Sequence, residues 1–157
     1  MLNIEKDKYI ILELIPSHSK SELGSIIQLQ ALKLEGLKLI SRFDYRLDEN
    51  KIDNKDLKEI VSYDKESFKY VSSSKKILNE FKKFSDGLPL LIIDNDYTKD
   101  YLKTLKNLKE SILKYLNLDM SDDVFSKIIS KYELEPTNHF VDLLYEALIK
   151  ESNNNSL

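Results

Sequence analysis

The chain has 157 residues, of which 41% are hydrophobic and 32% are charged, and its formal net charge at pH 7 is −3. This length fits one domain that buries a core without disulfides or a structural metal, and the charge argues against a broadly basic nucleic-acid-binding protein. The absence of cysteine excludes disulfides, thiolate zinc sites and a cysteine nucleophile.

The pattern of apolar residues argues against a membrane protein. The longest apolar stretch outside the first predicted strand, residues 88–93, is far too short to span a bilayer. The N-terminal residues 5–8 are all charged and precede a short apolar run, which is unlike a signal peptide. We therefore expect a cytoplasmic protein.

The first third of the chain predicts three strands. Residues 9–15 are apolar apart from Glu13, and the polar segment 16–22 that follows is typical of a loop. Residues 26–34 and 37–47 then alternate with a period of two, and Glu35 and Gly36 between them supply a tight turn. This pattern predicts a strand, a loop and an antiparallel hairpin.

The middle of the chain predicts helices on either side of one more strand. Asn54 can cap a short helix that runs to Val61, and one of the serines 72–74 can cap a longer helix that ends at Gly87. Residues 88–93 form a compact apolar strand. We expect it to lie parallel to an earlier strand, because a helical crossover leads to it.

The rest of the chain is predicted to be helical. Apolar residues recur at helical spacing over 97–105 and again over 112–116, and Ser121 can cap a further helix. Pro136 ends that segment, and Thr137 or Asn138 can begin the last helix. We expect a single domain over residues 1–151, followed by a disordered tail over 152–157.

Glu13 is the residue whose surroundings most constrain the function. A strand this apolar is expected to be covered on both faces, where a carboxylate is costly unless it reaches an edge, a partner or a cation. Two interpretations are open. Glu13 is either a strand-end residue that reaches water or a lysine, or a ligand left from a metal site.

The order of these elements, from Tyr9 to Lys150, resembles the ribonuclease H-like fold. It is most similar to the DEDDh branch of 3′-to-5′ exonucleases, which includes the proofreading exonucleases of bacterial replicative polymerases such as DNA polymerase III. The resemblance implies an α/β fold with a mixed sheet, antiparallel first three strands and flanking helices. The first motif of that family, Asp-x-Glu-Thr, falls on Glu13-Leu14-Ile15-Pro16.

The later motifs of the family fall on the second half of the chain. The segment from Ile93 to Leu102 resembles the second motif, with Thr98 at the position of a catalytic aspartate. The last motif, a histidine followed by an aspartate within a helix, falls on Thr137 and Asp142. His139 stands in for the histidine only if the turn is shortened.

These substitutions bear on catalysis. The family holds two divalent metals with a cluster of carboxylates, and the metals activate water and stabilise charge at the phosphate. Because magnesium requires oxygen ligands, Ile15 removes a ligand and Thr98 offers only a neutral hydroxyl. Glu13 and Asp142 alone remain as candidate metal ligands. We therefore favour a non-catalytic protein without a cofactor, which binds a protein or nucleic-acid partner in DNA replication or repair.

Two other interpretations remain open. The first is an active exonuclease using magnesium or manganese, in which a nearby acid replaces the ligand lost at Thr98; the candidates are Asp94, Asp96 and Asp100, with His139 as base. The second is a small α/β interaction module unrelated to exonucleases. Two of these residues also have simpler interpretations. Asp142 can be an acid favoured by the helix dipole, and His139 can be a turn residue.

A possible nucleic-acid contact lies near the second motif. Lys99, Lys103, Lys106 and Lys109 recur at helical spacing, close to Tyr97 and Tyr101. Lysines of this kind can follow a phosphate backbone while an aromatic ring stacks on a base. Tyr97, Lys99 and Lys103 are the candidate contacts, although a solvated helix face explains the same spacing.

Overall fold

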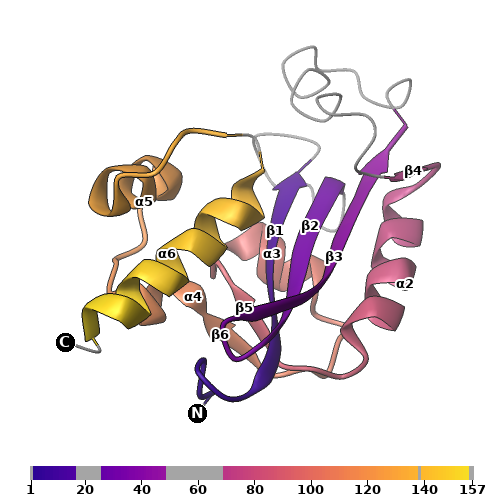
Figure 1. Ribbon diagram of the computed structural model, residues 1–157. Helices are drawn as coiled ribbons and strands as arrows, with labels where there is room; N and C mark the ends of the chain where they lie inside the picture. The colour runs from indigo at the N-terminus through magenta and orange to yellow at the C-terminus, as the bar shows by residue number, and fades with distance from the viewer. Residues whose placement is uncertain (1, 17–25, 49–68, 138, 156–157) are drawn as a thin grey trace.

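The computed structural model describes residues 2–16, 26–48, 69–137 and 139–155. These residues form a mixed α/β structure in which a six-stranded sheet, in the order β4-β3-β2-β1-β5-β6, has helices on both faces (Figure 1). The α/β class and the antiparallel first three strands are as the sequence predicts. Within the described residues, none of the helices combines the length and apolar composition needed to cross a bilayer.

The strands define a sheet with β1 near its centre. β1 (Lys8–Pro16), β2 (Ile26–Glu35) and β3 (Lys38–Leu47) pair antiparallel in chain order. On the other side of β1, β5 (Leu90–Ile92) pairs parallel with it, as predicted, and β6 (Lys109–Ser111) pairs parallel with β5. The short strand β4 (Lys69–Val71) lies parallel to β3 at the opposite edge.

The helices divide the core into two layers. α4 (Ile112–Tyr115), α5 (Val124–Tyr132) and α6 (Phe140–Asn155) pack with Tyr9 and Ile11 of β1. α2 (Ser74–Ser85) and α3 (Asp96–Tyr101) pack with Ile10 and Leu12 on the other face. Because successive side chains of a strand alternate between the faces, an apolar β1 is needed to support both layers.

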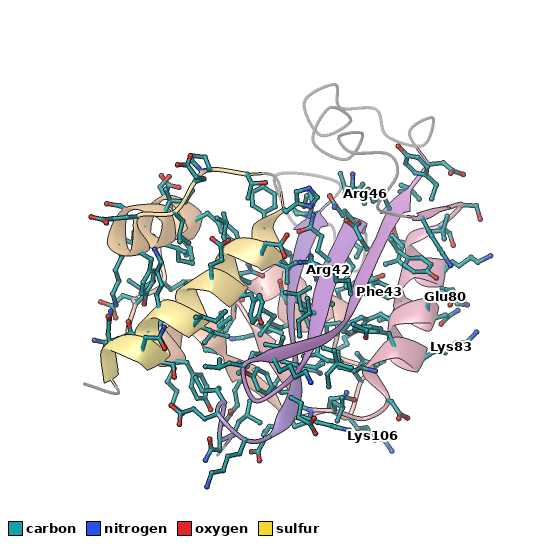
Figure 2. The ribbon with its side chains drawn as sticks, viewed as in Figure 1. Arg42, Phe43, Arg46, Glu80, Lys83 and Lys106 are labelled. Atoms are coloured by element: carbon teal, nitrogen blue, oxygen red, sulfur yellow. The ribbon has the colours of Figure 1, made fainter. Side chains whose placement is uncertain are left out.

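The same alternation sorts the side chains of β3. Phe43 points toward α2, where its ring lies 5.6 Å from that of Phe81, and it stacks on Tyr45 at 4.4 Å. Arg42 and Arg46 point to the opposite side of the sheet, the side that α6 covers (Figure 2). The polar side chains of the hairpin therefore lie on the face of the sheet that α6 covers.

Several predicted elements differ from the structure. The helix predicted over residues 97–105 ends at Tyr101, and the strand β6 was not predicted because its sequence, Lys-Glu-Ser, has no apolar alternation. The lysines at 99, 103, 106 and 109 therefore do not share a helix face. The Nζ of Lys109 instead donates hydrogen bonds to the carbonyls of Leu102 and Leu105.

The helix ends differ in smaller ways. α2 begins where it was predicted, with the Ser73 side chain accepting a hydrogen bond from the backbone N–H of Lys76. α5 begins at Val124, later than the predicted cap at Ser121. α6 continues to Asn155, so residues 152–155 are helical where a disordered tail was expected. The predicted helix from Asn54 to Val61 lies outside the described residues.

The β2–β3 turn generates the first testable prediction. Gly36 has φ +60°, and a Cβ at this position would lie 2.6 Å from the backbone oxygen of Glu5. We expect Gly36→Ala to lower the free energy of unfolding by about 3 kcal/mol, because backbone strain and a clash with the main chain add together. Urea unfolding followed by circular dichroism measures this change.

Gly87→Ala is the matched control for that prediction. Gly87 has φ +74°, but a Cβ there would meet no atom within 4 Å. We therefore expect Gly87→Ala to lower the free energy of unfolding by about 1 kcal/mol, because only the strain of the left-handed conformation applies. Equal losses of stability in the two variants would show that the close approach to Glu5 contributes nothing.

Candidate functional site: a polar face beneath the start of α6

Polar side chains from three strands meet on the side of the sheet that α6 covers. Glu13 of β1 pairs with Gln30 of β2, and Gln30 pairs in turn with Asp44 of β3. Two residues before Gln30 in β2, Gln28 pairs with Arg46 of β3. Side chains of directly paired residues lie next to one another on the same face. We call Glu13, Gln28, Gln30, Asp44 and Arg46 the polar face.

Glu13 is buried without an ion pair among the described residues. It is 7% exposed, and burial is the main cause that raises the pKa of its carboxyl to about 8; a hydrogen bond from the backbone of Leu14 opposes the shift. The pKa of Tyr97 is raised by its own burial and, secondly, by the charge of Glu13. Tyr97 and Glu13 are therefore neighbours, and at neutral pH the Glu13 carboxyl keeps its proton.

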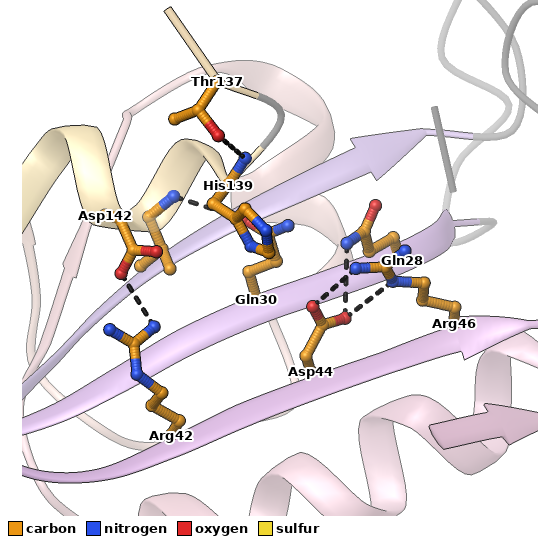
Figure 3. A network of polar contacts seen from close by, with 9 residues as sticks. Gln28, Gln30, Arg42, Asp44, Arg46, Thr137, His139 and Asp142 are labelled. Atoms are coloured by element: carbon orange, nitrogen blue, oxygen red, sulfur yellow. Dashed lines mark hydrogen bonds and ion pairs between the residues drawn. The ribbon is translucent and has the colours of Figure 1, made fainter. Parts of the chain in front are cut away.

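Arg46 and Asp44 form an ion pair at the other end of the polar face. The Arg46 side chain is fully buried, and its Nη2 and Nε lie 2.8 and 3.0 Å from the two carboxylate oxygens of Asp44. Gln28 adds a hydrogen bond from Nε2 to Asp44 Oδ1 at 3.2 Å (Figure 3). Two parallel hydrogen bonds between a guanidinium and a carboxylate are the strongest form of this pair.

The start of α6 is fixed to the same face. The Oε1 of Gln30 accepts a hydrogen bond from the backbone N–H of Val141 at 3.2 Å, which satisfies one of the free donors of the helix end. Arg42 Nη1 donates to Asp142 Oδ1 at 2.8 Å and so joins β3 to α6 (Figure 3). A cavity of about 240 Å³ lies between helix and sheet; its polar lining is Gln30, Arg42, Asp44, His139 and Asp142.

The predicted site residues lie near the starts of two helices, α3 and α6, and Gln30 links the two places, because it pairs with Glu13 and lines the cavity with His139 and Asp142. Glu13 lies with Tyr97 near the start of α3, whereas Asp142, His139 and Thr137 lie together at the start of α6. The Thr137 Oγ1 accepts a hydrogen bond from the backbone N–H of His139. The Asp142 carboxylate is engaged by Arg42 of β3.

The two positions where the resemblance implies lost acids are both buried. Ile15 is 8% exposed and packs with Ile27 and Leu47 in a small apolar cluster. Thr98 is 2% exposed in α3, and its backbone N–H donates to the side chain of Asn95, the residue that caps this helix. Neither position offers a charged oxygen to a metal.

The proposed replacement acids lie around α3. Asp94 accepts a hydrogen bond from the Ser111 hydroxyl at 2.9 Å, and Asp96 is exposed in the first turn of the helix. Asp100 Oδ1 pairs with Lys103 at 3.5 Å, while its Oδ2 is buried without a hydrogen-bond partner. Lys99 is exposed. Among the described residues, no three His, Asp or Glu side chains are grouped so that they could hold a metal ion.

Sequence reasoning missed most of the polar face, and also Arg42 beside it. Gln28, Gln30, Arg42, Asp44 and Arg46 appear in the sequence only as the polar positions of two alternating strands. The signal was available, because the turn at Gly36 fixes the register of the hairpin and places these five residues on one side. A search of known protein families and a search of curated proteins found no match to this chain.

The buried carboxyl of Glu13 generates a prediction about pH. Its folded-state pKa of about 8 lies above the ordinary value of 4.5, so the folded state keeps a proton that the unfolded state releases. The wild type therefore loses stability as the pH rises between these values. Relative to Glu13→Gln, which cannot titrate, we expect the loss to be about 1.4 kcal/mol per pH unit.

Urea unfolding at several pH values between 5 and 8 measures that difference, with each value set about one unit from the next. Glu35→Gln, at an exposed position of β2, controls for the removal of one carboxylate. A constant difference between Glu13→Gln and the wild type over this range would show that Glu13 does not keep its proton.

The two arginine pairs generate a prediction about buried charge. Arg46→Met leaves the Asp44 carboxylate, whose side chain is 14% exposed, without its partner, so we expect a loss of about 3–5 kcal/mol. Arg42→Met breaks a pair whose arginine is 55% exposed, which costs at most about 1 kcal/mol. Thermal and urea unfolding measure the loss of stability in both variants. Comparable losses would show that the buried Arg46 pair contributes no more to stability than the exposed Arg42 pair.

Proposed function

We propose that this chain is a non-catalytic protein with a ribonuclease H-like exonuclease fold, which acts by binding a protein or nucleic-acid partner. The resemblance described above implies a role in DNA replication or repair. The proposal has two parts, the fold and the loss of catalysis, and each is supported by separate features of the sheet.

The fold is supported by the order and direction of the strands. β1 lies between an antiparallel hairpin, β2 and β3, and the parallel strand β5 that follows the crossover helix α2 (Figure 1). This is the arrangement of strand, hairpin, helix and strand on which the resemblance rests. The start of α6 also lies on the face that carries Glu13, as expected for a last helix that contributes to a site on β1.

The loss of catalysis rests on one observation: none of the residues at the matching positions offers a free, ionised carboxylate. Asp142 is neutralised by Arg42, and Ile15 and Thr98 are buried among other residues. Burial raises the pKa of the Glu13 carboxyl to about 8, so a metal ion at neutral pH would have to displace its proton. A magnesium or manganese ion needs several ionised or polar oxygens directed at one point. These four positions supply a neutral acid and a carboxylate that is already paired.

One observation favours the alternative of an active exonuclease with a rearranged site. The Oδ2 of Asp100 is buried without a hydrogen-bond partner, which is uncommon for a carboxylate oxygen. Asp100 belongs to α3, the helix that carries Thr98 and approaches β1 through Tyr97. In this alternative, Asp100 would take the place of the missing acid and magnesium or manganese would be required.

A nuclease assay separates the two proposals. Single-stranded DNA and RNA labelled at the 5′ end are incubated with the protein in magnesium and in manganese, and shortened products are resolved on a gel. We expect no metal-dependent shortening at either end. Digestion that disappears in Glu13→Gln or Asp142→Asn would overturn the non-catalytic proposal, and digestion that disappears in Asp100→Asn would support the rearranged site.

A further inference from the structure

We draw no further inference here: the strongest candidate, the cavity of about 240 Å³ between the start of α6 and the sheet, belongs to the site already described, and the ionised side chains that line it, Arg42, Asp44 and Asp142, are paired with one another or with Arg46.

Discussion

The burial of β1 on both faces is the constraint on which the rest of the structure depends. β1 pairs with β2 on one side and β5 on the other, and both core layers pack against it. No side chain in its middle can reach solvent without crossing one of those layers. Burial therefore raises the pKa of the Glu13 carboxyl to about 8, and binding a cation at this position would require the loss of its proton.

The charged residues next to Glu13 follow from the same constraint. A desolvated charge is tolerated only with a partner, so buried Arg46 is matched by Asp44, and Gln28 completes the pair. Arg42, closer to the surface, engages Asp142 of α6. These pairs balance the charges of the sheet within the protein itself. The same cavity in a metalloenzyme would leave carboxylates free for a cation.

The sequence predicts the sheet well because hydrophobic alternation and turn chemistry are local. The run 9–15, the hairpin around Gly36 and the strand after Gly87 are all confirmed. Elements whose identity comes from pairing are not predictable in this way. β6 is a strand because β5 lies beside it, and its three residues carry no period of their own.

The site is less predictable than the fold for a related reason. Glu13 is conspicuous in the sequence because its neighbours are apolar, but Gln30 and Asp44 are ordinary polar residues of exposed-looking strands. They become a site only because α6 closes over that side of the hairpin, and its first turn comes from more than one hundred residues further along the chain. Local patterns contain no information about that contact.

The two cavities at α6 share a wall, and this limits how their roles can be separated. His139 and Asp142 line both the cavity above the polar face and a second cavity, which lies along α6 and the segment before it. Removing the Asp142 carboxylate would alter both cavities and would also leave Arg42 of β3 without its partner. A change at Asp142 therefore reports on the joint between helix and sheet as well as on either cavity.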